Sequence, residues 1–269
     1  MSFFSAADLY IRTYFHPHFQ KQESNDRVSI LRIYATERLQ ATVHDDVRKY
    51  CHFDKGGKFS IPTKDEILKN TVVVTTLSMS VALFRLGLTG EFSHILIDEA
   101  GQALEAEAIM PLSLAKSDTC IVLAGDHKQI SPTVYSDDAR EMKLHVSLLE
   151  RLFLRYKRKN LHEFNSVFLC RNYRSTADIV DYLASAFYQG SKSLLACGKP
   201  AKLEGYPLNF YSCGGEEVQD MESCSYYNEA EVDEILQVIK NLVATNPSLK
   251  LDEIGVVSPY AAQVYITFC

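Results

Sequence analysis

The sequence of 269 residues predicts an α/β fold with parallel sheets. Short apolar runs alternate along the chain with segments of helical periodicity, which is the order expected of strand–helix–strand units. The apolar runs are continuous rather than alternating, and such runs suit strands that are covered on both faces. Hydrophobic residues make up 46% of the sequence and charged residues 23%, a composition typical of a globular protein.

Seven apolar segments are the expected strands. Each is short, rich in β-branched or aromatic residues, and bounded by polar or turn-forming residues. In chain order they are residues 28–35, 71–77, 94–99, 120–125, 166–170, 208–213 and 254–259.

Three segments have the periodicity of helices: residues 146–156, 175–188 and 228–245. The second opens with Ser175, and an acidic residue follows three positions later, a variant of the capping box. The third opens with Asn228, which is a favoured N-cap residue with a glutamate at the capping-box position. Its apolar residues recur at helical spacing and predict a core-facing stripe.

A charged and polar segment, residues 155–166, separates a predicted helix from a new strand. We therefore expect a domain junction near residue 160, with one domain over residues 1–160 and another over 161–269. Five basic residues stand at the end of the predicted helix, and we interpret them as a solvated helix end. They are Arg151, Arg155, Lys157, Arg158 and Lys159.

Charge and cysteine usage exclude several classes of protein. The net charge is −6 and the pI is about 5.8, which argues against a uniformly basic nucleic-acid coat but allows a local basic strip. The seven cysteines include no CxxC pair, so reduced thiols of a cytoplasmic protein, with the nucleus as a second location, are expected rather than a disulfide framework. His16 and His18 are expected in a solvated loop rather than a metal site.

No membrane-spanning segment is predicted. The most apolar run, residues 71–84, is rich in Thr and Ser and is shorter than the roughly 20 residues that a spanning helix needs. The first fourteen residues lack a basic region followed by an apolar core, so we expect no signal peptide.

Two carboxylates, Asp98 and Glu99, directly follow the apolar run of residues 95–97. Ligands of open α/β sheets bind beyond the carboxyl ends of the strands. An aspartate there can hold Mg²⁺, and a neighbouring glutamate can orient or deprotonate a water molecule that attacks a phosphate. The pair therefore predicts the acidic half of a nucleoside triphosphate site. A pair of surface carboxylates at a strand end is the alternative.

The segment CIVLAGDHKQISP, residues 120–132, repeats the arrangement of an apolar strand followed by polar residues. Gly125 permits a turn and Asp126 follows it. The amide of Gln129 can both donate and accept hydrogen bonds, so it can bridge a γ-phosphate and the attacking water. Gly125, Asp126 and Gln129 are therefore candidate nucleotide contacts.

A third segment, FLCRNYRST, runs from a predicted strand into a helix. Arg174 is a candidate arginine finger, supplied by the second domain to phosphates bound by the first. Tyr173 offers a ring on which an adenine can stack, and Arg171 is a weaker candidate for a phosphate contact.

In this order, DEAGQALE, GDHKQISP, CRNYRS and IGVVSPYAAQ resemble the motifs of superfamily 1 RNA helicases of the nonsense-mediated-decay group. SAADLYI at residues 5–11 and VVVTTLSMS at residues 72–80 resemble two further motifs of that family. The resemblance covers nearly the whole chain. It implies two RecA-like P-loop NTPase domains, with ATP bound between them and RNA lying across both.

The resemblance also implies roles for single residues. Asp98 would hold Mg²⁺, Glu99 would activate water, and Gln129 would sense the γ-phosphate. Arg174 would act as the finger. Near the RNA path the resemblance places Thr75, Thr76, Ser258, Tyr260 and Gln263. Strand packing is the alternative for the two threonines. RNA is the expected partner, together with other RNA-processing proteins.

One family motif does not occur in the 269 residues. A phosphate loop has the pattern GxxxxGK[ST], and the nearest string, KGGKFS at residues 55–60, does not fit it. We expect the family's phosphate loop before Met1 and its later motifs, including a second arginine finger, after Cys269. Both RecA-like domains are then incomplete.

Three hypotheses follow from these motifs. The first is a segment of an ATP-dependent RNA helicase core. The second is a truncated chain with little ATPase activity that acts as an RNA- or protein-binding module. The third is a metal-dependent nuclease that uses Asp98 and Glu99, but this needs further clustered carboxylates, and the GDHKQ segment supplies only Asp126.

Overall fold

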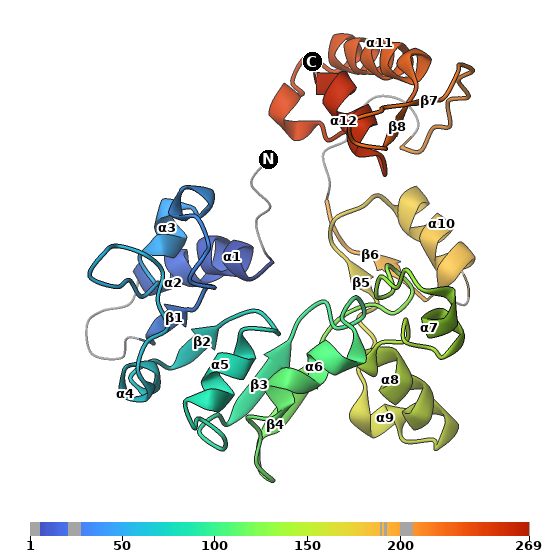
Figure 1. Ribbon diagram of the computed structural model, residues 1–269. Coiled ribbons are helices and arrows are strands. Elements are labelled where there is room, and N and C mark those ends of the chain that lie inside the picture. The colour runs from blue at the N-terminus through green and yellow to red at the C-terminus, as the bar shows by residue number, and fades with distance from the viewer. Residues whose placement is uncertain (1–5, 21–27, 189, 191–192, 200–206, 269) are drawn as a thin grey trace. The chain divides into compact units, whose positions relative to one another are not determined.

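The computed structural model describes residues 6–20, 28–188, 190, 193–199 and 207–268 (Figure 1). The chain forms two compact units, Met1–Val167 and Phe168–Cys269, which we call the first and second units and describe separately. The limits of the two RecA-like domains stay a prediction.

In the residues that the structure describes, the first unit has four short strands and a larger number of helices. The strands are β1 (Ile30–Arg32), β2 (Val72–Val74), β3 (His94–Ile97) and β4 (Cys120–Leu123). The helices are α1 (Ala6–Tyr10), the π-helix η1 (Ile11–Phe15), α2 (His16–Gln20), the 3-10 helix η2 (Gln40–Thr42), α3 (Asp45–Arg48), α4 (Lys64–Leu68), α5 (Ser80–Arg85), α6 (Glu105–Leu112), α7 (Asp137–Glu141), α8 (Leu148–Arg158) and α9 (His162–Asn165).

The strands of the first unit pair in parallel, as the sequence predicts. β1 pairs with β2, and β3 pairs with β4, which lies beside it in Figure 1. Burial alternates along β3, where Ile95 and Ile97 are buried but Leu96 is 73% exposed. The expectation that these strands are covered on both faces is therefore wrong for β3 in this structure, because one face has no packing partner among the described residues.

Apolar side chains of the first unit gather in three clusters. The largest joins β1 and β3 to helices α4 and α5 through Leu31, Ile67, Leu83 and Ile97. A second cluster lies around the buried residue Val47 of α3. The third joins α6 and the start of α8. These clusters hold the strands whose carboxyl ends carry the predicted site.

A buried ion pair ties α1 to the first two strands. Arg32 is 1% exposed, and its Nε donates to Oδ1 of Asp8 at 2.9 Å. Its Nη1 donates to the carbonyl oxygen of Ile33 at 3.1 Å and to that of Val74 at 3.4 Å. The guanidinium carbon also lies 4.0 Å from the ring centroid of Tyr34. Such a buried charge is stable only while these partners remain in place.

The second unit is built from shorter strands and longer helices. In chain order its elements are β5 (Arg171–Asn172), α10 (Ala177–Phe187), β6 (Leu195–Ala196), β7 (Val218–Gln219), β8 (Tyr226–Tyr227), α11 (Glu229–Thr245), the 3-10 helix η3 (Leu251–Glu253) and α12 (Ala261–Phe268). The β5–β6 pair is parallel, whereas the β7–β8 pair is antiparallel.

Three strands predicted after residue 165, the first of them at the boundary between the units, do not form. Residues 166–170, 208–213 and 254–259 are described but are not assigned to strands. A strand needs a hydrogen-bonding partner, and no described segment forms a ladder with these residues. Their apolar side chains are exposed as a result, with Val167 at 87% and Phe210 at 92%.

The three predicted helices are present as α8, α10 and α11, and the start of α11 agrees with the expectation whereas those of α8 and α10 differ. The expected cap at Ser175 is wrong, because the N-cap residue of α10 is Thr176, one position later. The Thr176 side chain makes no capping hydrogen bond. Asn228 does cap α11, and its side chain accepts a hydrogen bond from the Ala230 N–H at 3.0 Å. The predicted stripe of α11 is mostly half-exposed, and Val232 is its buried member.

Three smaller expectations concern the histidines, the cysteines and the membrane. His16 and His18 lie in helix α2, so the expected loop is wrong. Within the described part of the chain the six cysteines are free. No described helix combines the length and apolar character that crossing a membrane requires.

Candidate nucleotide and RNA site

The two predicted acidic segments meet at the carboxyl edge of the β3–β4 pair. The register pairs Ile97 with Leu123, so both strands end at the same level. Beyond that level the backbone pairing continues, since the Ala124 N–H donates to the Ile97 oxygen and the Ala100 N–H donates to the Ala124 oxygen, both at 2.8 Å. The loops that carry the DE and GDHKQ motifs are therefore held against each other.

Glycines allow this close approach. A Cβ atom at Gly101 would lie 2.7 Å from the carbonyl oxygen of Asp126, and one at Gly125 would lie 2.9 Å from the amide nitrogens of Ala100 and Gly101. Real Cβ atoms do not approach backbone atoms so closely, so side chains at either position would push the two loops apart. Gly125 also has a φ of 153°, a backbone conformation that other residues rarely adopt.

Asp98 and Glu99 are both exposed at this edge. Glu99 has a φ of 51°, in the left-handed region that is unusual for a residue other than glycine. Its Oε2 accepts a hydrogen bond from Nε2 of Gln102 at 3.0 Å, and its carbonyl oxygen accepts from the Gln102 N–H at the same distance. Unusual backbone conformations of this kind cluster at functional sites.

Gln129 is also exposed and is linked to Asp126. Its Nε2 donates to Oδ2 of Asp126 at 2.9 Å, and Oδ1 of Asp126 accepts from the Lys128 N–H at 2.9 Å. One carboxylate therefore fixes both the turn and the amide that follows it. The side-chain oxygen of Gln129 makes none of these bonds.

Tyr10, at the end of α1, is a neighbour of Asp98 that the sequence analysis missed. Its pKa is raised, first by the negative charge of Asp98, then by burial and by a hydrogen bond with the Asp98 side chain. No sequence signal relates two residues so far apart in the chain.

The predicted RNA contacts Thr75 and Thr76 lie directly after β2, also at the carboxyl end of a strand. The Thr75 hydroxyl is buried without a hydrogen-bond partner among the described residues. Thr76 is exposed, and its hydroxyl accepts from the Met79 N–H at 3.4 Å. Both threonines lie just beyond β2, and their role at RNA stays a prediction.

In the second unit, Tyr173 and Arg174 lie in an exposed turn between β5 and α10. The side-chain oxygen of Asn172 accepts hydrogen bonds from the Arg174 N–H at 2.9 Å and the Ser175 N–H at 2.8 Å. Gly198 passes directly behind this turn, where a Cβ atom would lie 2.2 Å from the carbonyl oxygen of Tyr173. Asn172 and Gly198 therefore set the turn, while the finger role of Arg174 stays a prediction.

The remaining predicted RNA contacts differ in exposure. Tyr260 is 44% exposed, and the Ser258 hydroxyl accepts a hydrogen bond from its N–H at 3.2 Å. Gln263 is only 4% exposed. Its Oε1 accepts from the Asn228 N–H at 2.7 Å, and its Nε2 donates to the Asn228 oxygen at 3.2 Å. Both ends of the Gln263 amide are thus used to join α12 to the start of α11, and its role at RNA stays a prediction.

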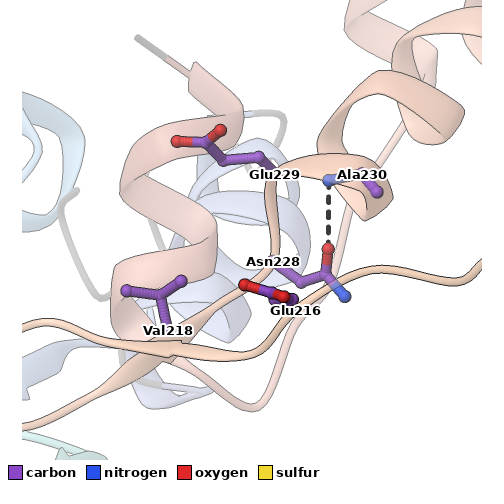
Figure 2. A pocket seen from close by; sticks show the side chains of 5 residues that line it. All are labelled: Glu216, Val218, Asn228, Glu229 and Ala230. Carbon is purple, nitrogen blue, oxygen red and sulfur yellow. Dashed lines mark hydrogen bonds between the residues drawn. The ribbon is translucent and has the colours of Figure 1, made fainter.

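A hollow of about 210 Å³ lies at the start of α11, and Figure 2 shows the side chains that line it. They include Glu216, Glu229 and Asn228, whose bond to the Ala230 N–H is the dashed line in the figure. Carboxylates at a helix N-terminus are favoured by the helix dipole. The dipole of α11 therefore accounts for the position of Glu229 at this hollow.

Comparison with known proteins places the chain in a family. Residues 60–137 match a family model described as AAA domain, and residues 144–267 match a second model with the same description. Together these matches cover most of the chain.

Several curated proteins are similar to the chain. "Probable helicase with zinc finger domain" is 48% identical in Homo sapiens and 46% identical in Danio rerio, in each case over 97% of the chain. These matches cover 13% and 14% of the two relatives, so the chain spans a small part of their length. "RNA helicase Mov10l1" of Homo sapiens is 31% identical over 88% of the chain and 21% of that protein.

Proposed function

Since this chain belongs to the superfamily 1 helicases with AAA domains, we propose that it is the segment of a helicase core that couples ATP hydrolysis to movement along RNA. The name of one relative, an RNA helicase, supports RNA as the partner. We also propose that the protein acts with other RNA-processing proteins in the cytoplasm or nucleus, where the free thiols of the described cysteines remain reduced.

One observation carries the proposal. The register and backbone hydrogen bonds of β3 and β4 bring Asp98 and Glu99 together with Asp126 and Gln129 at a single sheet edge. This edge is where open α/β sheets bind their ligands. Gly101 and Gly125 let the loop after β3 and the loop after β4 approach each other closely. Two isolated surface carboxylates at the end of one strand would not require this approach.

The donor set at this edge fits Mg²⁺ bound with a nucleotide. Magnesium at phosphate sites is held by one or two carboxylates together with phosphate oxygens and water. Asp98 supplies an exposed carboxylate of this kind, and bound Mg²⁺ would neutralise developing charge on the phosphates. Among the described residues there is no group of three or more metal-binding side chains, which is what the nuclease hypothesis needs.

The neighbouring residues have complementary chemistry. Glu99 can accept a proton from, or orient, a water molecule beside a phosphate. The amide nitrogen of Gln129 is held by Asp126, and its oxygen can accept a hydrogen bond from the same water. Arg174 would stabilise the charge of the transferring phosphate, and Tyr173 would stack on the base.

ATP hydrolysis tests this proposal. For the 269-residue chain we expect only background RNA-stimulated ATPase activity, because the sequence contains no GxxxxGK[ST] string to hold the phosphates. Any in-frame coding sequence before Met1 that contains this string should be expressed joined to the chain. That protein should hydrolyse ATP, and Glu99→Gln should slow it by about 100-fold or more, in the range seen for removal of a catalytic acid–base group.

Glu163→Gln is the matched control, because Glu163 is an exposed glutamate on α9. It should leave the rate unchanged. Equal rates for the Glu99→Gln protein and the unaltered protein would contradict the assigned role. ATPase activity of the 269-residue chain that Glu99→Gln abolishes would contradict the expected inactivity while supporting the site.

The second candidate function is RNA or protein binding without turnover. It is favoured by the lack of a GxxxxGK[ST] string in these 269 residues. RNA binding by the chain in the absence of ATP, measured by fluorescence anisotropy, would support it.

A further inference from the structure

The last turn of α8 carries basic side chains that the nucleotide site does not use. The apolar side chains of this helix are packed, since Leu148 is buried, Leu152 contacts the third cluster, and the ring of Phe153 lies 5.0 Å from that of His127. Arg155, Arg158 and Lys159 are spaced three and four residues apart, so their side chains are neighbours on one side of the last turns. All three are exposed.

Arg151, one turn earlier, differs from these three residues. Its Nε donates to Oε2 of Glu105 at 2.6 Å and its Nη2 to Oε1 of the same carboxylate at 2.5 Å. It is therefore a structural link between α8 and α6. In the part of the chain that the structure describes, no carboxylate forms an ion pair with Arg155, Arg158 or Lys159.

The basic residues are not needed to cap the helix. The carbonyl oxygens of Arg155, Tyr156 and Lys157 accept hydrogen bonds from the backbone N–H groups of residues 159, 161 and 160. Asn160 adopts a φ of 53°, the left-handed conformation common at helix ends. The backbone thus satisfies its own final turn. The side-chain nitrogens remain available, apart from a weak 3.4 Å bond from Arg158 Nε to the Leu154 oxygen.

Arg155, Arg158 and Lys159 line a hollow of about 320 Å³. We propose that this hollow binds the phosphate backbone of single-stranded RNA, as a contact separate from the path predicted at Thr75 and Thr76. The inference rests on the proposed RNA function and extends it. Guanidinium groups bind phosphate oxygens through paired N–H donors, and an ammonium group adds a point charge.

Two features favour RNA over an acidic protein segment. The chain has a net charge of −6, so the three cations are a local concentration on an otherwise acidic molecule, as expected of a strip that tracks a phosphate backbone. Helix α9 packs against α8, and its Phe164 is 85% exposed. Single-stranded nucleic-acid sites combine basic residues with exposed aromatic rings on which bases stack, and the neighbouring helix supplies such a ring.

The test is the binding of a fluorescein-labelled oligouridylate to the 269-residue chain, measured by fluorescence anisotropy over a series of salt concentrations. The triple variant Arg155→Gln, Arg158→Gln, Lys159→Gln should bind about 10- to 100-fold more weakly at ~0.1 M salt. Its plot of log K against log salt should be less steep by about 2, because each lost phosphate contact removes about 0.7 from the slope for a single strand.

The matched control neutralises three exposed lysines elsewhere in the first unit, Lys55→Gln, Lys58→Gln and Lys69→Gln. It changes the net charge equally and should keep most of the affinity. A double variant, Arg155→Lys and Arg158→Lys, retains charge and should bind RNA more tightly than the triple variant. Circular dichroism of each variant shows whether the helix has been retained.

The outcomes separate the two claims. If the unaltered chain does not bind the oligouridylate even at low salt, the proposed RNA function fails. If it binds but the triple variant and the lysine control lose affinity equally, the function stands and the α8 site is wrong. A polyaspartate peptide is the competing ligand. If it binds the unaltered chain as tightly as the RNA does, and the triple variant no longer binds it, the assignment to nucleic acid is wrong.

Discussion

The first and second units hold their predicted site residues in different ways. In the first unit, Asp98, Glu99 and Gln129 follow paired strands that are packed on apolar clusters. In the second, Arg174 follows a ladder of only two residue pairs, and its turn is held by one asparagine side chain and one glycine. Sheet packing makes the first arrangement robust, whereas the second depends on a few specific contacts.

Burial shows the same difference. The three apolar clusters all lie in the first unit. In the described part of the second unit the buried apolar residues are Val180, Ala184, Val232 and Ala262, while large apolar side chains such as Leu169 and Phe210 are exposed. Since apolar burial is the main favourable term in folding, substitutions of similar size should cost more in the first unit.

The largest expected effect comes from breaking the buried ion pair of the first unit. Arg32→Ala would remove the positive charge that pairs with the buried Asp8 carboxylate, and we expect a loss of about 3–5 kcal/mol in the free energy of unfolding. Urea unfolding followed by circular dichroism measures this loss. Lys69→Ala, an exposed control, should change stability by less than about 0.5 kcal/mol. Similar values for the two variants would show that the pair does not stabilise the first unit.

A pair of helix substitutions tests the difference in packing directly. Ile67 on α4 is fully buried, whereas Leu236 on α11 is 40% exposed. Ile67→Ala should lower stability by about 2–5 kcal/mol, the usual cost of truncating a buried aliphatic side chain. Leu236→Ala should cost less because much of its surface is already in water. Hydrogen exchange of the helix amides reports each effect locally, and equal costs would contradict the comparison.

Sequence patterns predicted the first unit better than the second. The four strands of the first unit fall inside predicted segments, because continuous apolar runs and parallel pairing agree there. Residues 166–170, 208–213 and 254–259 have similar runs, but strand formation requires a partner that a one-dimensional pattern does not reveal. The observed β7–β8 pair, which is antiparallel, was not predicted.

The candidate site shows the same limit. The meeting of the DE and GDHKQ loops could be predicted, because parallel strands bring their carboxyl ends to one edge. Asn172 could have been found from its position two residues before Arg174, the spacing of an asparagine turn. Gly198 and Tyr10 could not, since their importance comes from contacts between segments distant in the sequence.

A change at Gly198 should disturb the Arg174 turn without affecting the first unit. Gly198→Ala places a methyl group where the Tyr173 carbonyl oxygen lies, so the turn must shift, with an expected cost of about 1–3 kcal/mol. Hydrogen exchange at residues 172–175 should accelerate while exchange in β3 and β4 stays the same. Gly214→Ala, where a Cβ atom meets nothing within 4 Å, is the control. Unchanged exchange at residues 172–175 would mean that Gly198 does not support the turn.

The smallest effect concerns the hydrogen bonds of Asn172. Asn172→Ala removes the acceptor shared by the Arg174 and Ser175 N–H groups, and we expect the turn to lose about 1 kcal/mol of local stability. Exchange of these two amides should rise about five-fold, since each 1.4 kcal/mol corresponds to a factor of ten. Asn241→Ala is the control, because its side chain accepts a hydrogen bond from Gln237 on the exposed face of α11. Asn172→Asp keeps the acceptor oxygen and should retain the protection, so equal acceleration in the aspartate and alanine variants would contradict the proposed role of this oxygen in presenting Arg174.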